Sequence, residues 1–111
     1  MTSETFKSYN PATLEVLGEI SKMTERQVQE AVLAARRVQP QWQKIGFKKR
    51  RDYLLKARDV ILSDIDTIAE LISQENGKPI LEAIGNDLMP VMDLMTYFAK
   101  NAEKLLRREK L

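Results

Sequence analysis

Cysteine and histidine are both missing from the 111 residues of this chain. Without cysteine there is no disulfide, no thiolate metal ligand and no thiol nucleophile. Without histidine the chain lacks the side chain that titrates near neutral pH, so acid–base catalysis would depend on carboxylates, lysines, tyrosines or hydroxyls. The two absences leave metal chemistry and acid–base chemistry poorly supplied.

Long apolar runs and a strong charge of one sign are missing as well. No uninterrupted apolar run approaches the roughly 20 residues that span a bilayer. The first residues, Met1 to Thr5, lack the basic start and apolar stretch of a targeting segment. The 18 Lys and Arg residues nearly balance the 16 Asp and Glu residues, giving a net charge of +2. We expect a cytoplasmic protein, and neither a membrane nor nucleic acid is predicted as its partner.

The length and the 43% hydrophobic content suit a single domain with one modest core.

A β-hairpin is predicted over residues 6–22. The few apolar residues of this segment favour β-strands, and the turn formers Asn10-Pro11-Ala12-Thr13 interrupt them. Gly18 weakens its second strand, and a lone hairpin is marginal in water. We therefore expect the hairpin to pack against a larger structure.

Three helical regions are predicted after the hairpin, over residues 24–43, 47–76 and 79–108. Thr24 and Gln27 form a capping-box signature, so the first helix should begin near Glu25. Pro40 removes a backbone donor and disfavours helical geometry at the residue before it, which predicts an end or a kink near Gln39. Gly46 permits a turn before the second region.

The second region carries a wide apolar stripe that we expect to be mostly buried. Ser63 and Asp64 are good helix initiators and predict a break. Gly77 is expected to be a left-handed C-cap, followed by Pro79, which blocks continuation of the helix. The stripe consists of Leu54, Leu55, Ala57, Ile61, Leu62, Ile65, Ile68, Leu71 and Ile72.

The third region has the clearest helical pattern of the chain, with apolar residues alternating at three and four from Leu81 to Leu105. Pro90 lies inside this pattern and predicts a kink or a restart near Met89. The predicted fold class is therefore mainly α, with a short N-terminal β-hairpin and three to four helices.

Five local signals could indicate a site, and each has a plainer interpretation. The run Lys48-Lys49-Arg50-Arg51 could bind nucleic acid, but a solvated helix start is favoured. Gly77-Lys78 lacks the upstream glycine and the Ser or Thr of a phosphate loop, so a helix cap is favoured. Glu75 and Glu82 are interpreted as solvent-exposed rather than as paired carboxylates. Met89, Met92 and Met95 are interpreted as core filler, and Trp42 as a packing anchor.

Several segments together resemble the leading part of the aldehyde dehydrogenase family. The segment from Asn10 to Ile20 resembles the family's opening strand pair, and Glu75-Asn76-Gly77-Lys78-Pro79 resembles its Glu-Thr-Gly-Lys-Pro segment. Two departures are Leu14, where the family usually has a turn glycine, and Asn76, where it often has threonine. The first leaves the geometry of the turn open. Between and after these segments the resemblance also includes Val28 to Ala35, Trp42, Arg50-Arg51 and Tyr97-Phe98-Ala99.

The resemblance implies that residues 1–111 are one N-terminal segment with an incomplete cofactor domain. The family's enzymes use NAD or NADP and a cysteine nucleophile to oxidise an aldehyde to a carboxylic acid. No position here matches a catalytic, cofactor-binding or metal residue of the family. The four glycines, Gly18, Gly46, Gly77 and Gly85, are too scattered for a phosphate-binding loop.

Two hypotheses about function follow. The first is an N-terminal fragment of an NAD(P)-dependent aldehyde dehydrogenase, inactive alone, whether a truncated gene product, a split chain or an excised domain. By the resemblance, its apolar faces would meet cofactor-domain strands that this chain lacks. The second is a non-catalytic helical module that uses the same faces for self-association or for binding a partner.

Overall fold

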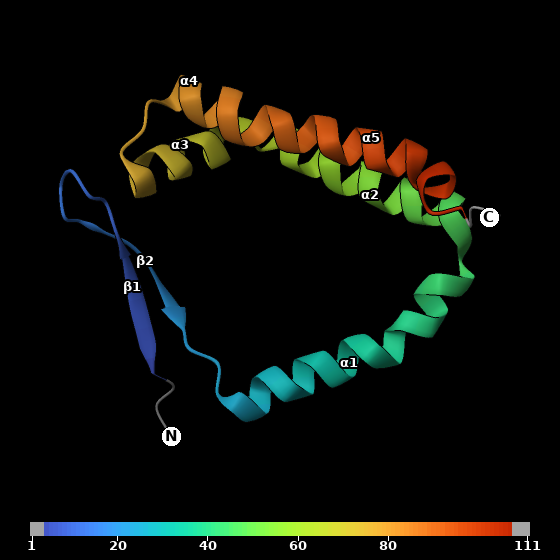
Figure 1. Ribbon diagram of the computed structural model, residues 1–111. Coiled ribbons are helices and arrows are strands. Elements are labelled where there is room, and N and C mark those ends of the chain that lie inside the picture. Colours follow the sequence, from blue (N-terminus) through green and yellow to red (C-terminus); the bar gives the residue numbers. More distant parts are fainter. Residues whose placement is uncertain (1–3, 108–111) are drawn as a thin grey trace.

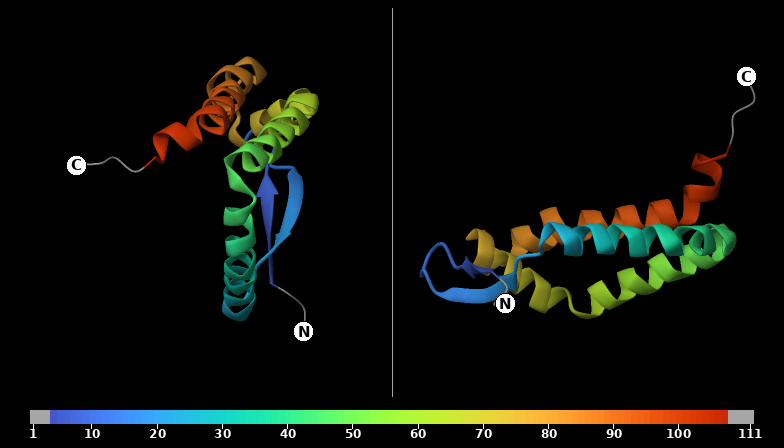
Figure 2. Two further views of the ribbon diagram at one scale, coloured as in Figure 1. Left: turned by 90° about the vertical axis from the view of Figure 1, so that its right-hand side faces the viewer. Right: turned by 90° about the horizontal axis from the view of Figure 1, so that it is seen from below.

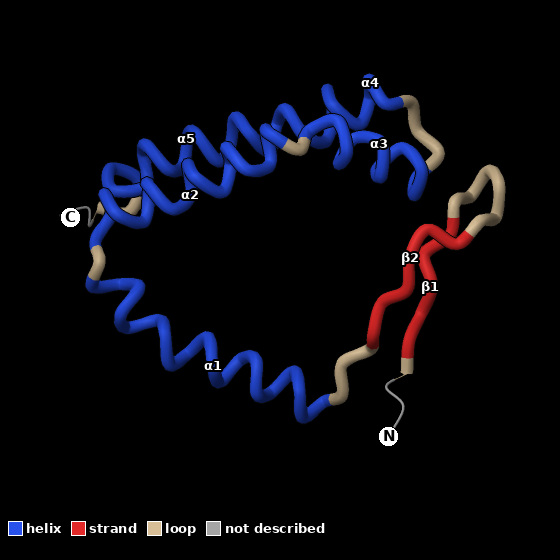
Figure 3. The backbone as a smooth tube through the Cα atoms, turned by 180° about the vertical axis from the view of Figure 1, so that it is seen from behind, coloured by secondary structure: helices blue, strands red, loops and turns tan. Residues whose placement is uncertain are grey.

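The computed structural model of this chain describes residues 4–107 and shows a β-hairpin followed by a series of helices (Figure 1). The elements follow one another around an open ring, which is equally plain from behind (Figure 3). Its radius of gyration is 18.6 Å and its extents are 56 × 42 × 29 Å. A compact domain of this length would have a radius of gyration of about 13 Å. The predicted fold class is confirmed, but the chain does not close around one core.

The hairpin consists of β1 (Thr5–Tyr9) and β2 (Val16–Ser21), paired antiparallel with Phe6 opposite Ile20. Its turn is organised by Asn10, whose Oδ1 accepts a hydrogen bond from the backbone N–H of Ala12 at 2.9 Å. The carbonyl of Asn10 accepts another from the N–H of Leu14 at 2.8 Å. These bonds confirm the hairpin predicted over residues 6–22.

Leu14 occupies the turn in a left-handed conformation, with φ at 62°. A leucine in this region brings its Cβ close to the backbone, which costs roughly 1–2 kcal/mol. The turn therefore keeps a geometry that suits glycine although leucine stands in it.

Helix α1 (Glu25–Lys44) begins where the capping box predicts. The Thr24 hydroxyl accepts a hydrogen bond from the N–H of Gln27 at 3.3 Å. The side-chain oxygen of Gln27 accepts one in return from the N–H of Thr24 at 2.8 Å. Two donors of the first turn are thus satisfied reciprocally.

Of the two outcomes predicted at Pro40, an end of the helix near Gln39 is wrong, because α1 continues through Pro40 to Lys44. The proline removes only the hydrogen bond to the carbonyl of Arg36, and that residue is exposed, so water can satisfy the carbonyl. The helix then continues to its C-cap, where the N–H of Ile45 donates to the carbonyl of Gln41 at 3.2 Å.

Helices α2 (Gly46–Ser63) and α3 (Ile65–Asn76) meet at Asp64. Gly46 makes the turn from α1 with φ at 77°, as predicted. The N–H of Asp64 is shared between the carbonyls of Val60 and Ile61, both at 3.2 Å, and α2 ends there. The predicted break near Ser63 and Asp64 is confirmed.

The third helical region contains three consecutive elements, α4 (Ile80–Glu82), the π-helix η1 (Ala83–Leu88) and α5 (Met89–Leu105). The N–H of Met89 donates to the carbonyl of Ile84, five residues back. This wider turn directly precedes Pro90, which has no N–H to donate. The predicted restart near Met89 is confirmed. The helix ends at Leu105, short of the predicted residue 108, which lies outside the described residues.

The core lies where α3 meets η1, and α5 runs along α2 (Figure 2). Buried Ala69, Ala83 and Leu88 form its centre. Met92 and Ala99 are the buried residues of α5, and the Arg58 guanidinium on α2 donates to the Thr96 hydroxyl on α5 at 2.9 Å. Five isoleucines pack around the centre and are only partly buried: Ile61, Ile65, Ile68, Ile72 and Ile84.

The expectation that the stripe of residues 54–72 is mostly buried is wrong. Only Ala69 in this stretch is buried, and Leu54, Leu62 and Leu71 are exposed. The physical reason is that α2 and α3 have a single layer of neighbours, η1 and α5, which covers one side of a wide apolar face.

Candidate functional site

The Gly77-Lys78 segment is a helix cap, as predicted. Gly77 has φ at 73°, and its N–H donates to the carbonyl of Ser73 at 2.8 Å. The ammonium of Lys78 forms an ion pair with Asp87 at 2.6 Å, and the Ser73 hydroxyl donates to the carbonyl of Lys78 at 2.6 Å. The lysine and its backbone thus hold the turn between α3 and α4.

The residues present do not fit a dinucleotide-binding loop. Gly46 and Gly77 lie at helix ends, Gly18 lies in the hairpin, and Gly85 lies inside η1. A phosphate loop needs glycines between a strand and a helix N-terminus, packed on a parallel sheet. The described residues contain only the antiparallel two-stranded sheet.

Titratable groups are likewise not gathered into a centre. Among residues 4–107, no group of three His, Cys, Asp or Glu side chains is placed to hold a metal ion. Glu75 and Glu82 are both exposed, and Glu75 accepts a hydrogen bond from the Ser8 hydroxyl at 2.8 Å. That bond ties the hairpin to the end of α3. The predicted absence of catalytic, cofactor and metal residues remains a prediction.

The methionines and Trp42 have mainly packing roles. Met92 is buried and Met95 is half-buried, whereas Met89 is exposed. Trp42 is half-buried, and its ring packs against Tyr53 with centroids 5.7 Å apart. This contact joins the last turn of α1 to α2 and confirms Trp42 as a packing anchor.

The main candidate for a functional surface is the apolar face that α1 leaves open. Helix α1 has 20 residues and none of them is buried. Its face carries Val28 and Val32, each 48% exposed, and Val38. Steps of four, three and three residues from Val28 through Val32 and Ala35 to Val38 place these side chains on one broad stripe of the helix. In a globular fold, the apolar face of an amphipathic helix packs against another element.

The hairpin and the corner between α1, α2 and α5 continue this open surface. Phe6, Val16 and Ile20 of the hairpin are all about half exposed. At the corner, a depression of about 140 Å³ is lined mainly by apolar and aromatic side chains. Sequence analysis does not find this depression, because its two walls come from residues about fifty positions apart. The lining comprises Trp42, Phe47, Arg50, Arg51, Leu54, Ala99, Ala102 and Leu106.

No described helix is both long enough and apolar enough to cross a bilayer. An amphipathic helix without a buried residue, together with a hairpin exposed at its apolar positions, leaves apolar faces of the described residues uncovered. The chain matches the model of the aldehyde dehydrogenase family over residues 1–111 and belongs to that family.

Individual relatives agree with this assignment. The chain is 33% identical over 105 residues to a 1-pyrroline-5-carboxylate dehydrogenase of Staphylococcus saprophyticus, covering 94% of this chain and 20% of the relative. It is 29% identical over 105 residues to an NADP-dependent glyceraldehyde-3-phosphate dehydrogenase of Streptococcus equinus, covering 95% of this chain and 22% of that protein.

Among solved structures, PnpE in complex with nicotinamide adenine dinucleotide superposes with a TM-score of 0.84 at 30% identity. The match covers 91% of this chain and 21% of PnpE. The chain therefore spans about a fifth of the length of the relatives it matches, and its fold corresponds to the N-terminal part of the family's fold.

Proposed function

We propose that this chain is the N-terminal scaffold of an NAD(P)-dependent aldehyde dehydrogenase, an enzyme that oxidises an aldehyde to a carboxylic acid, and that it is inactive alone. Its role is to dock on the part of the family's fold that carries the cysteine nucleophile and the cofactor site. The observation that carries the proposal is α1, an amphipathic helix of 20 residues without a buried side chain. A face that the chain leaves uncovered is available to the remaining four-fifths of the fold.

The relatives support a nicotinamide dinucleotide as the coenzyme without distinguishing NAD from NADP. One is named as NADP-dependent and another was solved with nicotinamide adenine dinucleotide. The proposal is therefore NAD or NADP for the assembled enzyme, with neither bound by this chain alone. We assign the scaffold to the cytoplasm, which suits a chain without cysteine.

The first experiment determines the native mass of the chain purified from its own cells and identifies any polypeptide that copurifies. We expect an assembly containing a cysteine-bearing aldehyde dehydrogenase portion, with aldehyde-dependent reduction of NAD or NADP. A homo-oligomer without such a portion, inert towards aldehydes, would favour the second hypothesis, a non-catalytic self-association or partner-binding module.

A pair of matched variants locates the docking face. Val28→Glu with Val32→Glu places two carboxylates on the apolar face of α1 and should abolish both assembly and activity. Arg37→Glu changes the net charge by the same amount at an exposed position on the opposite side of α1 and should leave both unchanged. If the two variants assemble equally well, α1 is not the docking face.

A further inference from the structure

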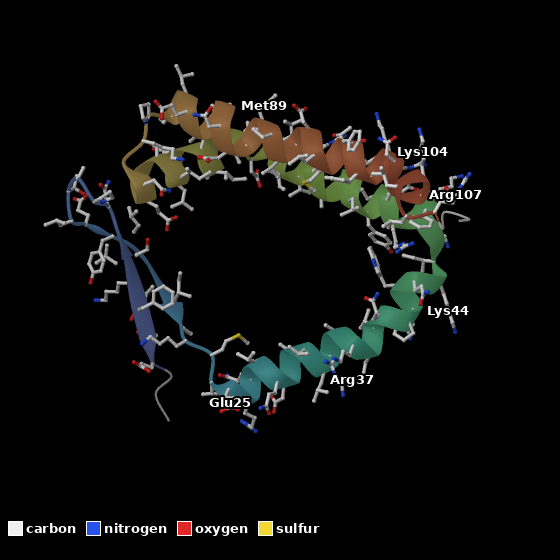
Figure 4. The ribbon with its side chains drawn as sticks, in the orientation of Figure 1. Glu25, Arg37, Lys44, Met89, Lys104 and Arg107 are labelled. Atoms are coloured by element: carbon white, nitrogen blue, oxygen red, sulfur yellow. The ribbon has the colours of Figure 1, made fainter. Side chains whose placement is uncertain are left out.

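Positive charge is concentrated at the corner where α1 meets α2 and α5 ends. Residues 44–52 and 100–107 contain eight of the 18 Lys and Arg residues but only two of the 16 Asp and Glu residues. Outside these segments the balance reverses, with ten cationic residues against fourteen carboxylates. Figure 4 shows Lys44, Lys104 and Arg107 at this end of the molecule. We call this group the basic corner: Lys44, Lys48, Lys49, Arg50, Arg51, Lys100, Lys104 and Arg107.

The basic corner surrounds a depression of about 230 Å³ between α2 and α5. Phe47 and buried Ala99 contribute apolar surface to it. Lys48 and Arg51 line it from α2, and Lys100 lines it from α5, together with Glu103. The depression thus combines an apolar surface with cationic side chains from two helices.

The two lysines that line the depression are available to form ion pairs with a partner. Arg51 is engaged by Asp52 at 3.2 Å, and the Arg50 guanidinium lies 4.4 Å from the centre of the Phe47 ring. By contrast, neither Lys48 nor Lys100 forms an ion pair with a carboxylate of residues 4–107. Like charges held close together repel one another, and a partner that supplies carboxylates removes this repulsion.

We propose that the basic corner binds an acidic segment of a protein partner. Carboxylates of the segment pair with Lys48, Lys100 and Lys104, and one apolar side chain of the segment packs on Phe47 and Ala99. The anchor residues Phe47 and Ala99 also line the neighbouring apolar depression at this corner, whereas Lys48 and Lys100 line only the basic one, and the interaction does not rest on the proposed dehydrogenase assembly.

The geometry favours an acidic polypeptide over a single-stranded nucleic acid. Nucleic-acid grooves of this size stack bases on open aromatic faces. Among the described residues that line the depression, Phe47 is the only aromatic one, and Arg50 already lies over one face of its ring. Carboxylates need no stacking surface, and an apolar anchor needs only the small surface that Phe47 and Ala99 provide.

The test measures binding of a fluorescent peptide of glutamates with one central phenylalanine to the full chain, by anisotropy at low and high salt. The corner variant carries Lys48→Glu, Lys100→Glu and Lys104→Glu. The matched control carries Lys7→Glu, Arg26→Glu and Arg37→Glu, which are exposed cations on the hairpin and α1, so both variants have the same net charge. Circular dichroism checks that both keep the helical content of the parent chain.

We expect the parent chain to bind the peptide, with affinity falling as salt rises. The corner variant should bind about tenfold more weakly, and the control should bind within about threefold of the parent. Equal losses in the two variants would show attraction by net charge alone and would overturn the proposal. Absence of binding at low salt, or tighter binding of oligouridylate or of phosphatidylserine vesicles than of the peptide, would overturn it as well.

Discussion

The packed helices and the arm that precedes them both contain amphipathic sequence, yet only the packed helices contain buried residues. Helices α3, η1 and α5 bury Ala69, Leu88 and Met92 against one another and α2. The arm, consisting of the hairpin and α1, has no buried residue. The comparison shows that a periodic pattern identifies the apolar face of an element but not what covers it.

The two regions therefore depend on different sources of stability. Burial of a leucine or methionine side chain stabilises the packed helices by about 1.5–3 kcal/mol each. An isolated helix of 20 residues, the length of α1, has only marginal stability in water. Helix α1 must therefore depend on its capping box and on the Trp42–Tyr53 contact at its far end.

The largest expected effect comes from Leu88→Ala, which opens a cavity in the packed helices. Leu88 is 6% exposed and belongs to the central cluster. The substitution should lower the free energy of unfolding by about 3 kcal/mol, measured by urea denaturation followed by circular dichroism. Leu81→Ala is the control, since Leu81 is 82% exposed and should change stability by less than about 0.5 kcal/mol. Comparable losses in both variants would mean that the helices are not packed as the structure shows.

A smaller effect, confined to the arm, is expected from Thr24→Ala. The substitution removes the hydroxyl that accepts the hydrogen bond of the Gln27 N–H, while the bond from the Thr24 N–H to the Gln27 side chain is retained, and it should destabilise α1 by about 1 kcal/mol. Hydrogen exchange of the α1 amides should accelerate roughly fivefold, while exchange in α3 and α5 should not change. Thr24→Ser retains the hydroxyl and should restore protection. If exchange in α5 accelerated equally, the two regions would unfold as one unit.

The sequence predicts most local features because each depends on a few neighbouring residues. Local chemistry specifies each of these caps and breaks. Thr24 and Gln27 exchange hydrogen bonds, Gly77 adopts a left-handed conformation, and Pro90 lacks an N–H to donate. The helix end expected at Pro40 fails because a proline next to solvent removes only one bond, and water replaces it.

The features that the sequence does not predict depend on residues far apart. Burial of the stripe at residues 54–72 requires neighbours on both sides, and periodicity alone does not show that only one side is covered. The depression lined by Phe47, Lys48 and Lys100 forms because α5 returns along α2, which local patterns do not specify. The chain spans about a fifth of its relatives, and the open faces are those that the proposed docking would cover.

The smallest expected effect tests the strained turn of the arm. Leu14 has φ at 62° and a side chain that is 75% exposed. Its backbone conformation therefore costs free energy that burial of the side chain does not offset. Leu14→Gly should stabilise the hairpin by about 0.5 kcal/mol, because relief of the strain outweighs the greater flexibility of glycine in the unfolded chain. The measurement is hydrogen exchange of the cross-strand amides of β1 and β2. Leu14→Ala keeps a Cβ and should bring no gain, so stabilisation by alanine would show that the exposed apolar side chain, rather than the backbone conformation, is what weakens the turn.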